Sequence, residues 1–186
     1  RDLDGRMVQW KANDPLSFFQ TGKYINHNVA IEGGNDRSSF RASFSSLKNT
    51  SIMVAGTELK RNNFNIRGTQ KIGKIFSLDV SADYTDNDMV NPIRQGGNYN
   101  PVFRFVYGRP RNLDIDYWSK NYIDLVNGGR KTGGVTDPYG ISQFMFETFE
   151  YKQVRNEKVF RSNIDLNGNI TDWLSFLVRG NVQTEL

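Results

Sequence analysis

Residues 76–85 read FSLDVSADYT, and apolar and polar side chains alternate through the whole stretch. Successive side chains of a β-strand point to opposite faces, so this pattern predicts a strand with one apolar and one polar face. Its ten residues exceed the roughly 5–6 of an average globular strand and match the ~9–11 of a tilted strand that crosses a bilayer. The alternative is a long amphipathic strand in a soluble β-sandwich.

The neighbouring sequence predicts that this strand belongs to a repeated hairpin. Residues 61–70 also alternate, and a tight link at 71–74 joins them to the first stretch. A similar unit returns about a hundred residues later, with residues 63–68 aligned to 163–168 and residues 72–78 aligned to 170–176. Repeated hairpins with constant turns are typical of an up-and-down antiparallel barrel.

Six crossings can be placed along the chain, and their links alternate between short and long. The strands are expected near 27–33, 38–46, 61–70, 75–85, 157–168 and 173–185. Links at 33–37, 71–74 and 169–172 are tight, whereas 47–60 and 86–156 are long. Outer-membrane barrels have short periplasmic turns and long extracellular loops. The predicted organisation is therefore a loop or strand end over 1–26, strands over 27–85, an extracellular loop over 86–156, and a hairpin over 157–186.

The direction of the strands restricts the long link. The strand that ends at residue 85 runs from the side of the short turns to the side of the long links. An odd number of strands must therefore follow it before the chain reaches the tight turn at 169–172. One crossing is the simplest solution, so residues 143–155 are assigned to the loop or to an extension of the following strand. Six strands cannot close a barrel, because the smallest have eight. Either the chain is an excerpt of a larger polypeptide that supplies the other strands, or the membrane interpretation is wrong.

Composition excludes several classes of function. Hydrophobic residues make up 37% of the 186, mean hydropathy is -0.60, and no apolar run approaches the ~18 residues of a membrane helix. The 24 basic and 20 acidic residues are interspersed, which argues against nucleic-acid binding despite a net charge of +4. With no cysteine and a single histidine, His27, a metal or redox cofactor is not expected.

An enzymatic function is not expected either. Acidic residues such as Asp114, Asp116 and Asp124 are available for glycoside hydrolysis, but their spacing singles out no catalytic pair. A Ser-His-Asp arrangement would depend on His27, and the glycine pairs at 96–97 and 128–129 do not open helices after strands.

The alternation assigns a face to each strand residue. Apolar side chains expected to face lipid are Phe40, Phe44, Phe64, Ile66, Phe76, Leu78, Val80, Phe176 and Val178. Polar side chains expected to face the lumen are Arg41, Asn65, Arg67, Asp79, Asp83, Arg179 and Asn181.

The loop over 86–156 is too long to be a passive connection. It contains a predicted helical turn at 101–107 and several large aromatic side chains. Arginine and aromatic residues are the commonest energetic anchors of interfaces, and aromatic rings also stack on sugars. The candidate contacts to substrate or to a covering protein are Arg109, Arg111, Tyr117 and Trp118. In the alternative, these aromatics pack the loop against itself.

Several stretches resemble the early barrel of the SusC/RagA family of TonB-dependent outer-membrane transporters from Bacteroidetes. They are DGRM at 4–7, FFQTG at 18–22, NVAIEGGN at 28–35, LKRNNFN at 59–65 and ITDWL at 170–174. The resemblance runs through nearly the whole chain and is weakest over 86–156.

This resemblance implies a barrel of about 22 strands with an N-terminal plug domain that is absent from this chain. It implies a SusD-like surface lipoprotein as a lid, the TonB complex as energy source, and a glycan or peptide as cargo. The expected function is import of a bulky nutrient across the outer membrane of a Gram-negative bacterium. The alternative is a passive, porin-like barrel or a structural or adhesion barrel.

Overall fold

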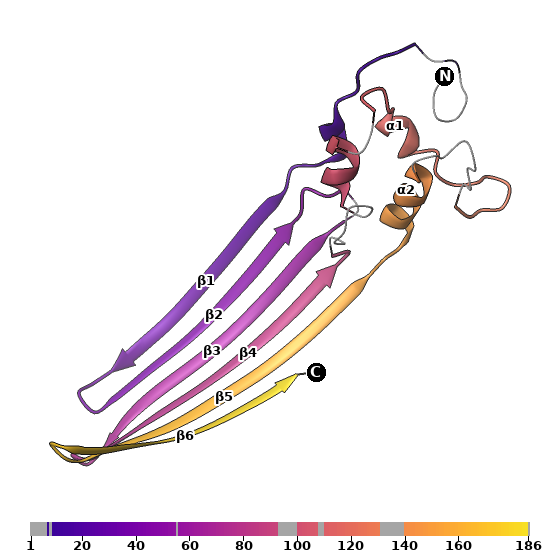
Figure 1. The fold of residues 1–186 in the computed structure, drawn as a ribbon. Coiled ribbons are helices and arrows are strands. Elements are labelled where there is room, and N and C mark those ends of the chain that lie inside the picture. Colours follow the sequence, from indigo (N-terminus) through magenta and orange to yellow (C-terminus); the bar gives the residue numbers. More distant parts are fainter. Residues whose placement is uncertain are drawn as a thin grey trace. The chain divides into compact units, whose positions relative to one another are not determined.

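A computed structural model describes residues 7, 9–54, 56–92, 100–107, 110–130 and 140–185. Its main element is an antiparallel sheet of six strands, which follow one another across the sheet in sequence order (Figure 1). The strands are β1 (Lys23–Gly34), β2 (Ser38–Thr50), β3 (Glu58–Ile72), β4 (Phe76–Val90), β5 (Val154–Thr171) and β6 (Leu174–Glu185). The chain is thus mostly β, with an up-and-down order of strands, as the alternation predicts.

The observed strands are longer than predicted, chiefly at the ends away from the short turns. β1 begins at Lys23 rather than near residue 27, β4 continues to Val90, and β5 begins at Val154. These extensions carry mixed side chains that do not alternate, such as the DNDM at 86–89. Backbone pairing continues there without the period-2 pattern, which is why the sequence alone underestimates the strands.

Three short turns join the strands in pairs. In the first, the Asn35 side-chain oxygen accepts hydrogen bonds from the backbone N–H groups of Arg37 (2.8 Å) and Ser38 (2.9 Å). In the second, Gly73 adopts a φ of 66°, a left-handed conformation that favours glycine. In the third, the Thr171 hydroxyl accepts a hydrogen bond from the Leu174 N–H at 3.0 Å. All three lie at the predicted links.

β4 pairs directly with β5, so a single crossing follows the long link, as the strand directions require. β1 and β6 form the two edges of the described sheet.

The segments outside the sheet form a second compact unit. It comprises the described residues of Arg1–Lys23, Thr50–Glu58 and Val90–Val154, and we call it the loop unit. The sheet unit comprises Tyr24–Asn49, Leu59–Met89 and Arg155–Leu186. The loop unit contains a 3-10 turn η1 (Pro15–Phe18), a π-helical turn η2 (Phe103–Tyr107), and the helices α1 (Ile115–Trp118) and α2 (Ile141–Glu150).

Among these elements, η2 was predicted from the sequence and α2 was not. η2 lies in the helical turn expected at 101–107. α2 occupies part of the stretch assigned to the loop or to an extension of β5. Its buried Ile141, Phe144 and Met145 follow helical spacing, so packing inside the loop unit favours a helix there. No helix in the described part of the chain is both long and apolar enough to cross a membrane.

Candidate functional site

One face of the sheet unit carries polar side chains that contact one another across strands. At the β1–β2 pair, the Arg41 guanidinium donates to the Glu32 carboxylate at 2.6 Å. At the β3–β4 pair, the Asn65 amide donates to the Asp83 carboxylate, and the Thr85 hydroxyl donates to the Asn63 oxygen at 3.0 Å. Alternation of the backbone places these side chains on one face.

Asp79 is the most connected group on this face. Its carboxylate accepts hydrogen bonds from the Thr69 hydroxyl at 2.6 Å and from the Asn167 amide at 3.4 Å. The Arg67 guanidinium lies 3.7 Å from the same carboxylate. Asp79 on β4 therefore ties together side chains from β3 and β5, the two strands on either side.

The β5–β6 pair also has a cross-strand contact between polar side chains, in this case a bidentate ion pair. Asp165 lies opposite Arg179 in the strand register, and the guanidinium donates to both carboxylate oxygens at 2.8 and 2.7 Å. Asn181 lies opposite Asn163, whose amide donates to the Ser81 hydroxyl at 3.4 Å. The seven residues predicted to face a lumen thus share one face of the sheet.

The other face of the sheet unit is apolar and open. Large hydrophobic side chains stand exposed along all six strands, among them eight of the nine residues predicted to face lipid: Phe40, Phe44, Phe64, Ile66, Phe76, Val80, Phe176 and Val178. The ninth, Leu78, is half-buried. An extended apolar surface of this kind is unusual on a soluble monomer and marks contact with a partner or a membrane.

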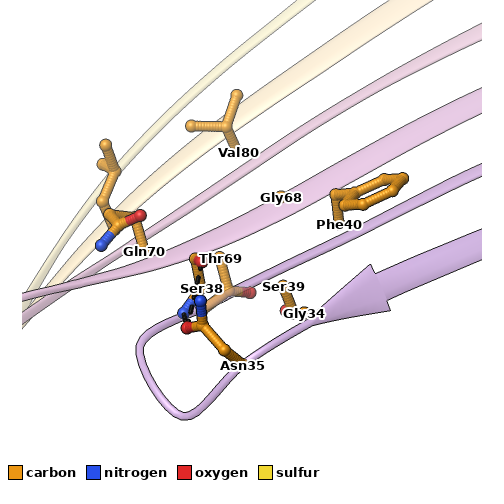
Figure 2. A pocket seen from close by; sticks show the side chains of 10 residues that line it. Gly34, Asn35, Ser38, Ser39, Phe40, Gly68, Thr69, Gln70 and Val80 are labelled. Carbon is orange, nitrogen blue, oxygen red and sulfur yellow. Dashed lines mark hydrogen bonds between the residues drawn. The ribbon is translucent and has the colours of Figure 1, made fainter.

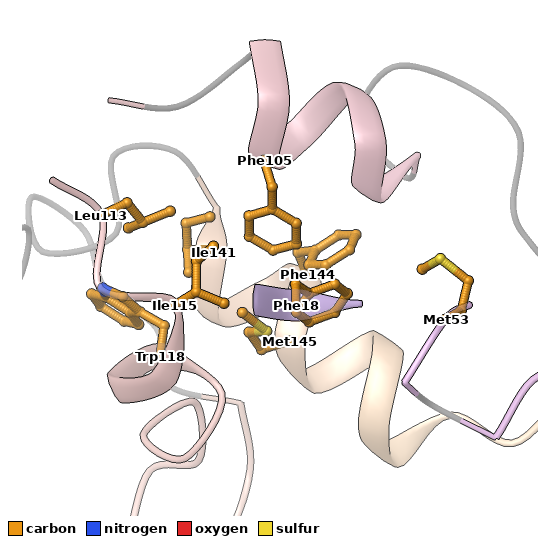
Figure 3. Packing of buried hydrophobic residues seen from close by; sticks show 9 residues of the cluster. All are labelled: Phe18, Met53, Phe105, Leu113, Ile115, Trp118, Ile141, Phe144 and Met145. Carbon is orange, nitrogen blue, oxygen red and sulfur yellow. The ribbon is translucent and has the colours of Figure 1, made fainter. Parts of the chain in front are cut away.

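The loop unit has the opposite organisation, because it buries its apolar side chains in a core of its own. This core unites η1, η2, α1 and α2 with the link between β2 and β3 (Figure 3). Its members are Phe18, Met53, Phe105, Leu113, Ile115, Trp118, Ile141, Phe144 and Met145. The Phe18 ring packs on those of Phe105 and Phe144, with centroids 4.5 and 5.9 Å apart.

The four candidate contact residues occupy different environments within the loop unit. Trp118 is 1% exposed and belongs to the core, which is the alternative considered above for the loop aromatics. Tyr117 is half-buried, with its ring edge-on to Trp118 at 5.6 Å. Arg111 is exposed, and its carbonyl oxygen accepts a hydrogen bond from the Asn13 N–H at 2.7 Å. Arg109 lies outside the described residues.

The sequence analysis missed the most exposed apolar side chains of the loop unit. Leu125 is 96% and Val126 is 91% exposed, at the tip of a turn. The Asp124 carboxylate accepts from the Val126 N–H at 2.9 Å and from the Asn127 amide at 3.1 Å, which holds the turn in shape. The sequence DLVNGG at 124–129 is a recognisable turn signal, so two aliphatic residues inside it could have been noticed.

A second aromatic group lies at the edge of the loop unit. The Tyr122 ring stacks on Phe149 at 5.5 Å, and its hydroxyl donates to the Glu150 carboxylate at 2.8 Å. Burial raises the pKa of the Tyr122 phenol, and the hydrogen bond to Glu150 and its negative charge raise it further.

The described residues contain no group of three or more His, Cys, Asp or Glu side chains placed to hold a metal ion. Comparison with protein-family models finds no match to this chain, and comparison with curated proteins finds none.

Proposed function

We propose that the sheet unit is part of the wall of an outer-membrane β-barrel, with the polar face toward a water-filled lumen and the apolar face toward lipid. The observation that supports this most is the separation of the two faces. Cross-strand hydrogen bonds and ion pairs cover one face, while exposed aromatic and aliphatic side chains cover the other. In a bilayer the second face needs no further cover.

The connections support an orientation for this wall. The three turns Asn35–Arg37, Gly73–Ile75 and Asp172–Trp173 are short, and the links after β2 and β4 are long. We infer that the short turns are periplasmic and that the loop unit is extracellular. Further strands must pair with β1 and β6 in the closed barrel, since six are too few.

Within this frame, the resemblance to SusC/RagA transporters supports TonB-dependent import of a bulky glycan or peptide together with a SusD-like lipoprotein. The loop unit has a folded core, which favours a defined surface on which such a lid could dock. Leu125 and Val126 offer that surface a small apolar contact, and Arg111 and Tyr117 are the other candidate contacts. Trp118 would contribute indirectly by holding α1 in the core.

An uptake experiment tests this proposal. Cells that carry the full-length polypeptide are offered fluorescent oligosaccharides and oligopeptides, with and without a protonophore that removes the energy source of TonB. We expect saturable uptake of one cargo class that stops when the protonophore is added. Uptake that continues would support the porin-like alternative, and recovery of the protein outside the outer membrane would overturn the proposal.

A lid-binding experiment tests the role of the exposed turn. Replacing Leu125 and Val126 by Asp should reduce co-purification of the lid lipoprotein by about tenfold, because each change removes apolar contact area and adds a charge. Lys120→Asp, an exposed change in the same unit, serves as the matched control. Equal loss in the control would show that the turn has no particular role.

A further inference from the structure

The polar face of the sheet unit is hollowed near the short turn between β1 and β2. The hollow has a volume of about 680 Å³, and its lining includes Glu32, Ser39, Arg41, Arg67 and Thr69. Four of these five side chains make the cross-strand contacts described above, which places the lining on the polar face. The volume falls within the ~300–1,000 Å³ of pockets that bind small molecules.

Small residues make room for this hollow. Gly34 has no side chain, and Ser39 and Thr69 have short ones. Figure 2 shows these three residues beside the β1–β2 turn, in the lining of a second hollow of about 600 Å³ that opens to the apolar face. The long side chains of Arg41 and Arg67 therefore stand at the border of an open space on the polar face.

These two arginines lie opposite each other on neighbouring strands. The Asn63 amide on β3 donates to the Ser45 hydroxyl on β2 at 3.2 Å. Counting four residues from this pair toward the short turns places Arg41 opposite Arg67. Like charges directly opposite each other destabilise a pair of strands. An anion between the two guanidinium groups would therefore remove an unfavourable interaction.

Most hydrogen-bond donors of the two guanidinium groups are unused within the described part of the chain. Arg41 makes one hydrogen bond, to Glu32 at 2.6 Å. Arg67 makes none with the described residues, and its ion pair with Asp79 spans 3.7 Å. The two side chains are 55% and 66% exposed. Since a guanidinium offers five N–H donors in a planar fork that matches a carboxylate, both groups can bind a further acceptor.

The surroundings of the hollow carry a positive net charge. Residues 32–41 and 67–79, which form the turn ends of β1–β2 and β3–β4, contain five basic and three acidic residues. Of the acids, Glu32 is bound to Arg41, and Asp79 is shared by three side chains from β3 and β5. The two arginines thus lie in a region that attracts anions.

We propose that this hollow binds a carboxylate group of the cargo between the guanidinium groups of Arg41 and Arg67, with the Ser39 hydroxyl as an additional donor. The inference rests on the proposed function, which places the polar face in the lumen. Because the short turns are periplasmic in that arrangement, the cargo meets this site late on its way through the barrel. The inference narrows the cargo to oligosaccharides or peptides that carry an acidic group.

The opposed arginines favour a carboxylate over an uncharged group. The hydroxyl or amide oxygen of an uncharged cargo can accept hydrogen bonds from Arg41 and Arg67, but it leaves their mutual repulsion in place. A carboxylate accepts the same hydrogen bonds and also neutralises positive charge. Hydrogen bonds between ionised partners are roughly twice as strong as those between neutral groups.

Calorimetric titration of the purified full-length protein tests the requirement for charge. The probes are tetragalacturonic acid and its methyl ester, and the C-terminal amides of tetraglutamate and tetraglutamine, all at one fixed salt concentration. We expect one acidic probe to bind about tenfold more tightly than its uncharged counterpart. The pair of probes that shows this difference identifies the source of the carboxylate.

Variants of the arginines test which side chains bind the acid. Arg67→Gln keeps a hydrogen-bonding amide but loses the charge, so it should weaken binding of the acidic probe about tenfold and leave the uncharged probe unchanged. Arg41→Gln should have the same effect, so misfolding of one variant leaves the test intact. Arg61→Gln is the matched control, because Arg61 lies on the same face of β3, outside the hollow, and donates to the Asn87 oxygen at 2.7 Å.

A further pair of variants tests the hollow itself. Ser39→Phe places a ring in the open space and should weaken binding of the acidic probe severalfold. Ser43→Phe adds the same volume on the same face of β2, outside the hollow, and should leave binding unchanged.

Several results would overturn the inference. Equal binding of acidic and uncharged probes, equal losses in Arg67→Gln and Arg61→Gln, or equal effects of the two phenylalanine variants would each do so. A protein that imports cargo in a protonophore-sensitive way but shows no preference for the acid refutes only the carboxylate site. A protein recovered outside the outer membrane refutes the proposed function and this inference together.

Discussion

The two units of this chain use the same kinds of residue in opposite ways. In the loop unit, Phe18, Trp118 and Ile141 are shielded from water in a common core. In the sheet unit, Phe40, Phe64 and comparable side chains stand exposed, and the polar residues are the ones that contact each other. The loop unit thus shields its large apolar side chains from water, as a water-exposed domain does, whereas one face of the sheet leaves them exposed, as a surface in contact with an apolar environment does. The following experiments are designed to break or sharpen this contrast.

The largest effect is expected from removing the centre of the loop core. Trp118→Ala should destabilise the loop unit by about 3–5 kcal/mol, the usual cost of truncating a buried tryptophan. Limited proteolysis of the full-length protein across a urea series measures the change as a shift in the cleavage midpoint of this unit. Trp10→Ala is the matched control, since Trp10 is 70% exposed. Similar shifts for both variants would contradict the assignment of a core.

A charge on either face of β4 should separate the two surfaces of the sheet. Val80→Arg places a cation on the face proposed to contact lipid and should cost about 2–4 kcal/mol near the bilayer centre. Ser81→Arg places it on the polar face, where water is accessible. The heat stability of the folded protein in detergent and its yield in the outer membrane measure the difference. Equal yields and equal stability would refute the assignment of faces.

A smaller effect is expected within the polar network. Asp79→Ala removes the acceptor shared by Thr69, Asn167 and Arg67 and should cost about 1 kcal/mol, because water partly replaces the lost contacts. Ser77→Ala on the same face of β4 is the control. The unfolding midpoints of the two variants should therefore differ, with Asp79→Ala the lower; no difference would mean that the network contributes little.

The smallest expected change is in the pKa of the Tyr122 phenol, which belongs to the loop unit. Glu150→Gln should lower the raised pKa of Tyr122 only part of the way toward its ordinary value, because burial is the larger cause of the shift. Since a raised pKa stabilises the fold below the ordinary tyrosine value, that contribution is lost as the pH rises through the folded-state pKa. Difference spectra against Tyr122→Phe follow this single phenol. An unchanged pKa would show that Glu150 has no influence.

The sequence was most informative where one physical rule dominated. Strands such as β3 and β4 were predictable because each residue has one of two faces, and alternation reveals which. The partners of Asp79 were not predictable, since they depend on the register of three strands. The loop core was also hidden, because Phe18, Met53 and Phe105 are far apart in the sequence and follow no common period. The burial of Trp118 in this core was hidden in the sequence for the same reason.

The dispersed origin of the loop core has a consequence for the order of folding. Phe18 precedes β1, Met53 lies between β2 and β3, and Ile141 lies between β4 and β5. These side chains are separated by up to four strands in the sequence, and such distant contacts form slowly. A slip of one residue in any of these strands would turn its side chains to the wrong face. Closure of the loop core would then depend on correct assembly of the strands.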